Sequence, residues 1–128
     1  MIKNQLIKWI PINGIPDIFY LDSIFDGKDG VYFNLSCDLE NEEKVLVIYF
    51  DSLFSYRVTN ESYRLKFIMV HNIEKPSFFI VKDSSYISWF KDESFHVYQS
   101  NILHYIILTG NDIIDVISEF KPSVYWKG

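Results

Sequence analysis

Strand-length runs of apolar or alternating residues, each closed by turn-forming residues, make up most of this 128-residue chain. Runs this short are typical of β-strands, because an amphipathic helix needs a longer periodic stretch. Residues 31–37 alternate four apolar side chains with polar ones, which predicts a strand with one buried face. Residues 26–30, rich in Asp and Gly, predict a hairpin turn, since Asp-Gly pairs supply positive φ angles. The chain is therefore predicted to fold largely as antiparallel hairpins.

Other segments carry the same strand signals. Residues 44–50 are nearly all apolar, which predicts a central strand covered on both faces. Residues 112–120 fit a strand or a helix, and we favour a strand because most of their apolar residues are β-branched. The tail at 124–126 is either a last strand or a docked terminus. Strands are also predicted at 17–25, 54–59, 63–70, 78–81 and 102–109.

One helix is predicted, at residues 85–95. Ser84 or Ser85 would cap its first turn, and Tyr86, Trp89 and Phe90 recur at helical spacing. The predicted fold is thus α+β and β-rich: an antiparallel meander sheet with one short helix. The sheet forms either a half-barrel wrapped on the helix or a small sandwich. Without an internal linker or repeat, residues 1–128 are expected to form a single domain.

Composition narrows the classes of partner and compartment. The chain is 48% hydrophobic and 18% aromatic, which supports a packed core, and its net charge is −5. An acidic chain with two arginines lacks the basic surface of a nucleic-acid binder. There is no signal-peptide pattern and no apolar run long enough to span a membrane. With a single cysteine, Cys37, no internal disulfide forms, so we expect a cytoplasmic protein that binds neither nucleic acid nor membrane.

No catalytic or cofactor motif is present in the sequence. The three histidines do not have metal-ligand spacing, and glycine-rich phosphate loops and nucleophile motifs are absent. His104 lies in an apolar strand, where it is expected to be a core or edge histidine satisfied by one hydrogen bond. Cys37 shares the apolar face of residues 31–37 and is expected to be buried. We therefore expect no catalytic residue, no metal, no cofactor and no enzymatic activity.

The most distinctive stretch is residues 56–65, which holds both arginines among tyrosines. Tyr and Arg are the favoured anchors of protein interfaces, so a recognition surface is one interpretation. The other is structural, with the arginines paired to Asp51 or Glu61 across a hairpin. The predicted binding residues are Tyr56, Arg57, Glu61, Tyr63 and Arg64.

Four segments, at residues 50–61, 89–94, 104–107 and 114–117, resemble a group of small uncharacterised bacterial proteins. These proteins are similar in style to immunity proteins of bacterial toxin systems. The resemblance implies a binding role and assigns no functional residue. A protein-binding module, an immunity-type inhibitor of a bacterial toxin, is therefore the first functional hypothesis. Such an inhibitor would use acidic residues 38–43 to compete for a cationic cleft.

Two alternatives stay open. The first is a small-ligand-binding protein or enzyme with a cavity between sheet and helix, lined by the aromatic residues of 86–90. His104 or Arg57 would be its polar handle. The second is a structural subunit of a larger assembly, joined through an exposed edge strand.

Overall fold

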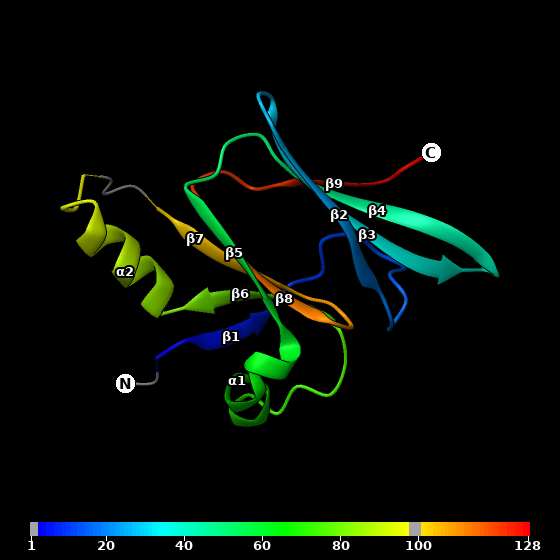
Figure 1. The fold of residues 1–128 in the computed structure, drawn as a ribbon, viewed down its shortest axis with the longest axis horizontal. Helices are drawn as coiled ribbons and strands as arrows, with labels where there is room; N and C mark the ends of the chain where they lie inside the picture. Colours follow the sequence, from blue (N-terminus) through cyan, green and yellow to red (C-terminus); the bar gives the residue numbers. More distant parts are fainter. Residues whose placement is uncertain (1–2, 98–100) are drawn as a thin grey trace.

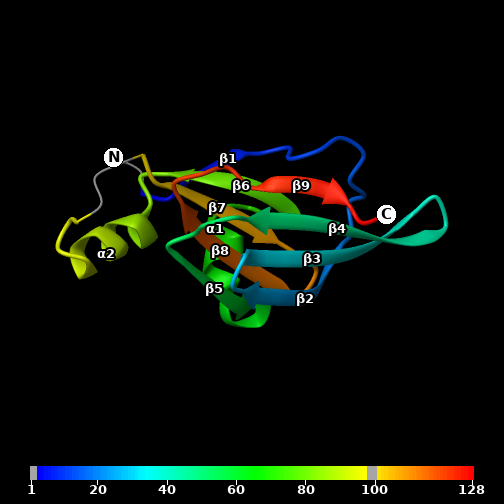
Figure 2. The same cartoon turned by 90° about the horizontal axis from the view of Figure 1, so that it is seen from above.

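Two antiparallel sheets pack face to face in the computed structural model, which describes residues 3–97 and 101–128 (Figures 1 and 2). Strands make up 49% of the chain, which confirms the predicted β-rich α+β class in its sandwich form. Every strand pair is antiparallel, as expected for a chain that reverses direction at short turns.

The two sheets differ in size and in how they are assembled. The four-stranded sheet has the order β2-β3-β4-β9 and contains three strands consecutive in sequence. Its strands are β2 (Tyr20–Gly27), β3 (Gly30–Leu39), β4 (Glu42–Phe50) and β9 (Ser123–Trp126). The five-stranded sheet has the order β1-β6-β7-β8-β5. Its strands are β1 (Gln5–Lys8), β6 (Ser77–Lys82), β7 (Leu103–Leu108), β8 (Asp112–Ser118) and β5 (Ser55–Asn60).

The main core lies between the two sheets. Phe33, Leu35 and Ile48 from the four-stranded sheet meet Ile107 and Ile114 from the five-stranded one, all with no exposed surface. The alternating apolar face predicted for residues 31–37 is this inner face of β3, and Cys37 is buried there as expected. Burial of large side chains of this kind, worth about 1.5–3 kcal/mol each, holds the sheets together.

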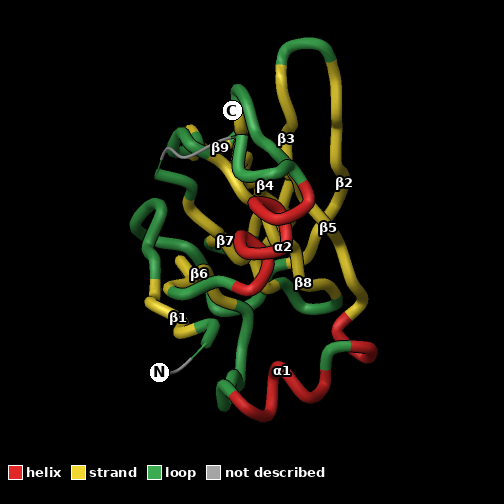
Figure 3. The backbone as a smooth tube through the Cα atoms, turned by 90° about the vertical axis from the view of Figure 1, so that its left-hand side faces the viewer, coloured by secondary structure: helices red, strands yellow, loops and turns green. Residues whose placement is uncertain are grey.

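The other face of the five-stranded sheet is covered by two short helices. They are α1 (Leu65–Val70) and α2 (Ser85–Glu93), and they lie over separate parts of the sheet (Figure 3). Phe67 and Ile68 of α1 pack near Ile106 and Ile113, whereas α2 packs through Tyr86 near Ile117. This face is therefore divided between two apolar clusters.

The helix predicted at 85–95 is α2, and Ser84 caps it by accepting a hydrogen bond from the Ile87 backbone N–H at 3.0 Å. Residues 112–120, favoured as a strand, contain β8, and the tail forms β9. The strand predicted at 63–70 is wrong. A 3₁₀ turn, η1 (Glu61–Tyr63), and then α1 occupy these residues. The Asn60 side chain accepts from the Ser62 backbone N–H and starts this helical turn, a local signal that outweighs the β-propensity of the segment.

Two hairpin turns differ in how they reverse the chain. The turn predicted at 26–30 contains two Asp-Gly pairs, and the positive φ belongs to Gly30 of the second pair, at +124°, rather than to Gly27 of the first. The β3–β4 hairpin reverses through Glu40 and Asn41, both at positive φ, as a two-residue turn of this hand requires. This hairpin extends beyond the rest of the sandwich (Figure 2).

Tyr105 of β7 places one polar atom in the core without a partner. The residue is 1% exposed, its ring contacts those of Trp9 and Phe50, and no described residue bonds its hydroxyl. Burial also raises the pKa of this phenol. We expect Tyr105→Phe to stabilise the fold by about 1 kcal/mol, because it removes an unsatisfied buried group.

Thermal unfolding checks this expectation through a rise in Tm of about 2–5 °C. Tyr86→Phe is the matched control, since the Tyr86 hydroxyl is hydrogen-bonded to Ser55, and its loss should lower Tm. A lower Tm for Tyr105→Phe would show that the hydroxyl is satisfied.

Candidate functional site

A buried carboxylate organises the helix-covered face of the five-stranded sheet. Asp115 of β8 has no exposed surface, and its two oxygens take three charged or ring N–H partners. Oδ2 accepts from Arg57 Nε at 2.9 Å and from Arg64 Nη1 at 3.0 Å. Oδ1 lies 2.7 Å from Nε2 of His104. Both arginines of the chain therefore converge on one carboxylate.

Strand register explains how these groups meet. Arg57 of β5 lies directly opposite Asp115, so the two side chains share a face of the sheet. His104 comes from β7 on the other side of β8, diagonal to Asp115, because Ile106 is the residue directly opposite. Arg64 reaches the same carboxylate from the junction between η1 and α1. Residues far apart in sequence thus form one polar cluster between the two helices.

The cluster continues from His104 to the start of α2. His104 Nδ1 lies 2.7 Å from Ser84 Oγ, the oxygen that caps α2. The Arg57 guanidinium lies over the Tyr86 ring, 4.3 Å from its centroid. These contacts tie α2, as Arg64 ties α1, to a single carboxylate in the sheet.

The cluster keeps Asp115 charged. Burial by itself would raise the pKa of this carboxyl group, but the His104 hydrogen bond and the Arg57 charge outweigh burial. The pKa of Asp115 is lowered from 3.8 to about 2. The carboxylate is therefore ionised at neutral pH and compensates two guanidinium groups.

Ser84, His104 and Asp115 are the residue types of an acyl-transfer triad, but their environment does not suit that chemistry. Ser84 is 5% exposed and its oxygen already accepts from the Ile87 N–H, so a substrate carbonyl has no approach to it. Both ring nitrogens of His104 are engaged. His104 is thus buried as predicted, with two hydrogen bonds rather than one, and it has no free nitrogen to serve as a polar handle for a ligand.

The structure places the five predicted binding residues at different depths. Arg57 and Arg64 both form ion pairs with Asp115. The predicted pairing of these arginines with Asp51 or Glu61 is therefore wrong. Tyr56 points into the core, with its ring edge-on to Phe33 and its hydroxyl bonded to Asp26.

The remaining predicted residues lie in the 3₁₀ turn. The Glu61 backbone N–H donates to the Asn111 carbonyl and joins η1 to the loop before β8. Tyr63 is largely exposed. Together with Arg64, Lys66 and Phe67 it lines a groove whose volume is about 490 Å³. The five residues therefore do not share one surface, because Tyr56 packs toward the core whereas Tyr63 is exposed.

Exposed apolar side chains gather on η1 and α1. Tyr63, Leu65, Met69 and Val70 are 59–83% exposed, and α1 has no buried residue. We call these four residues the α1 ledge. A cluster of exposed large apolar side chains indicates a contact surface more often than a single exposed apolar residue does.

Asp115 was missed by sequence reasoning, although a signal was present. It interrupts an otherwise apolar strand, in the run Ile-Ile-Asp-Val-Ile. A carboxylate in a strand buried on both faces requires compensating charge, and the chain offers two arginines for it. The pattern around Asp115 therefore indicates Arg57 and Arg64 as candidate partners.

Comparisons with protein-family models, with curated proteins and with solved structures gave no match to this chain. Over residues 3–97 and 101–128, neither helix has the length and hydropathy needed to cross a membrane. The same residues hold no group of three His, Cys, Asp or Glu side chains that would ligate a metal.

Proposed function

We propose that this protein is a protein-binding module, an immunity-type inhibitor that binds a bacterial toxin through the α1 ledge. The observation that carries the proposal is the exposure of four large apolar side chains on η1 and α1. Tyr and Met are enriched in protein interfaces, and an apolar centre with a polar rim is the usual anatomy of such a surface.

Rigidity beneath the ledge supports the same function. Arg64 immediately follows Tyr63, and its guanidinium is bonded to the buried Asp115 and lies over the Phe67 ring at 4.7 Å. Before Tyr63, the Glu61 backbone N–H is bonded to the Asn111 carbonyl, so the backbone on both sides of Tyr63 is held in place before a partner arrives. A preordered anchor loses less conformational entropy on binding, which favours affinity.

Charge supports a cationic partner. The β3–β4 hairpin carries acidic residues at its projecting tip. Among residues 3–97 and 101–128, Asp38, Glu40 and Glu43 form no ion pair, whereas Lys44 pairs with Glu42. Together with the net charge of −5, this tip would accelerate association with a basic toxin surface without being part of the contact itself.

The test is capture followed by reconstitution. Tagged protein is used to capture partners from cells of its source, and each stoichiometric partner is then expressed and purified alone. A toxin partner should arrest growth when it is expressed alone, and co-expression of this chain should restore growth. Binding in vitro should slow as salt increases. The proposal fails if no captured protein is toxic, or if toxicity persists when this chain binds.

Tyr63→Ala is expected to weaken toxin binding by roughly 10- to 100-fold, because truncating an aromatic hot spot costs about 2 kcal/mol. Stability should stay within about 0.5 kcal/mol, since the side chain is 83% exposed. Calorimetric titration gives the affinity and urea unfolding the stability. Phe120→Ala truncates an aromatic side chain in the β8–β9 loop that is 59% exposed; it is the control and should bind normally. Equal affinity of both variants would place the contact outside the ledge.

A further inference from the structure

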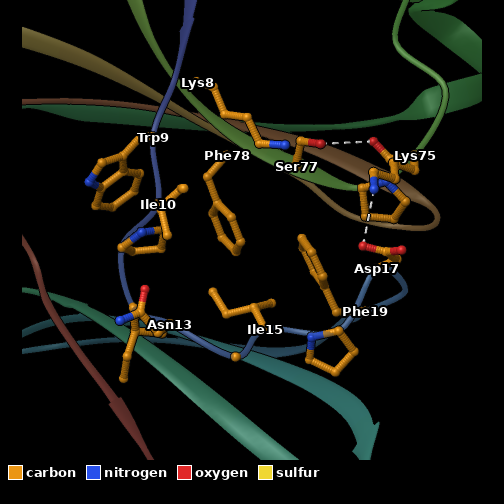
Figure 4. A pocket seen from close by; sticks show the side chains of 15 residues that line it. Lys8, Trp9, Ile10, Asn13, Ile15, Asp17, Phe19, Lys75, Ser77 and Phe78 are labelled. Atoms are coloured by element: carbon orange, nitrogen blue, oxygen red, sulfur yellow. Dashed lines mark hydrogen bonds and ion pairs between the residues drawn. The ribbon is translucent and has the colours of Figure 1, made fainter.

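A second feature, independent of the α1 ledge, lies at the end of the sandwich where residues 9–19 connect β1 to β2. This loop encloses a cavity of about 300 Å³ against the start of β6 (Figure 4). Its walls are aromatic and aliphatic: Trp9 lines the cavity, and Ile15, Phe19 and Phe78 point toward the same space. A volume of this size accommodates one or two fused rings.

The aromatic walls have a defined geometry. Phe19 and Phe78 are stacked, with ring centroids 4.9 Å apart and an angle of 12° between ring planes. Trp9 stands edge-on to Phe78 at 6.0 Å. Phe19 and Phe78 are nearly fully buried and so are held in place, whereas Trp9 is half-buried. Flat faces at right angles favour a planar ring as the occupant, through stacking and edge contacts.

The rim of the cavity carries net positive charge. Lys75 forms an ion pair with Asp17 at 3.1 Å, so these two charges cancel. Lys8, at the end of β1 beside Ser77, has no ion-pair partner among residues 3–97 and 101–128 (Figure 4). One cation therefore remains beside an apolar cavity in a protein of net charge −5.

The loop itself supplies hydrogen-bond donors. Within the part of the chain that the structure describes, no backbone N–H of residues 10–18 donates to another residue. Pro11 and Pro16 restrict the loop conformation, so its shape does not require internal hydrogen bonds. The non-proline N–H groups of this segment have no acceptor among the described residues, and such donors together with Lys8 suit an anion.

We propose that this cavity binds a small planar aromatic carboxylate. Its ring lies against Trp9, Phe19 and Phe78. Its carboxylate faces Lys8 and the amides of the loop. An aromatic cation is disfavoured, because Asp17 is already neutralised by Lys75 and Lys8 would repel it.

The experiment is an NMR titration of the ¹⁵N-labelled protein with indole-3-carboxylate, and with neutral indole as the matched probe. The carboxylate should bind with a Kd of about 0.1–1 mM, as expected for a ligand of this size. Shifts should localise to the Trp9 indole N–H and to the amides of the non-proline residues among 10–17. Absence of saturable shifts, or shifts centred elsewhere, would overturn the proposal.

Two variants separate charge from shape. Lys8→Met should weaken carboxylate binding by roughly 3- to 10-fold and leave indole binding unchanged. Lys82→Met, at the opposite end of β6, removes the same charge and should change neither. Ile15→Trp, which fills the cavity, should abolish binding of both probes while the amide spectrum stays folded. Equal carboxylate affinity in the Lys8 and Lys82 variants would overturn the proposed charge recognition.

Discussion

Asp115→Ala is expected to lower the free energy of unfolding by about 3–5 kcal/mol, because it leaves buried charge without its partner. The carboxylate has no exposed surface, compensates the charges of Arg57 and Arg64, and is hydrogen-bonded to His104. The Arg64 side chain is only 19% exposed, so water cannot fully replace the lost carboxylate there. Both helices should loosen together, since the cluster joins α1 and α2 to the same strand.

Urea unfolding measures this loss from the shift in transition midpoint. Asp115→Asn keeps the size of the side chain and removes its charge, so its cost should be smaller, at about 2–3 kcal/mol. Asp17→Ala is the control: it breaks an exposed ion pair and should cost less than about 1 kcal/mol. If Asp115→Ala lowered the free energy of unfolding no more than Asp17→Ala does, the charge cluster would make no net contribution to stability.

Acid should weaken the same cluster. Because the pKa of Asp115 is lowered from 3.8 to about 2 on folding, its contribution is complete above pH 3.8. The contribution is lost as pH falls through about 2, and it amounts to roughly 2 kcal/mol. Stability measured between pH 5 and pH 2 should therefore fall more steeply in the native protein than in Asp115→Asn. Parallel pH profiles for the two proteins would contradict this assignment.

Gly30→Ala is expected to destabilise the fold by about 3 kcal/mol or more, for reasons of backbone geometry. Gly30 has a φ of +124°, which side-chain-bearing residues rarely adopt. A Cβ at this position would lie 2.5 Å from the Phe50 carbonyl oxygen and 3.1 Å from that of Asp51. These backbone atoms lie at the end of β4, so relief would require β3 and β4 to separate.

Gly14→Ala is the matched control for Gly30→Ala. Gly14 also has a positive φ, at +83°, but an added Cβ there meets nothing within 4 Å. Gly14→Ala should lower the free energy of unfolding by about 1 kcal/mol, because the only cost is that of a side chain at positive φ. Denaturant unfolding of both variants separates the two causes. Equal losses would mean that φ, rather than the contact with β4, governs the effect at Gly30.

Local patterns predicted the strands well where one face is buried. Alternation at 31–37 corresponds to β3, because burial of one face of a sheet imposes a two-residue period on the sequence. The apolar run at 44–50 corresponds to β4, because a short run rich in β-branched residues is typical of an inner strand. The serine before α2 marked its start because a cap acts within three residues. The strand prediction for residues 63–70 was wrong because their apolar side chains follow no single period. The Asn60 cap therefore determined their conformation.

The fold determines which residues the two arginines contact. Strand pairing brings Arg57, His104 and Asp115 to one face from three separate strands, and no local spacing records that register. The aromatic cavity has the same origin, since Trp9 and Phe78 become neighbours when β1 pairs with β6.

The sequence by itself determined that this protein is β-rich and acidic, with a helix at α2 and a distinctive Tyr/Arg segment, because each of these properties arises within a few neighbouring residues. The tertiary structure decided which surfaces are available. It packed the Tyr56 ring toward the core, exposed Tyr63 and bound both arginines to Asp115. The physical reason is that long-range pairing and burial depend on which strands become neighbours, and a single sequence does not state that order.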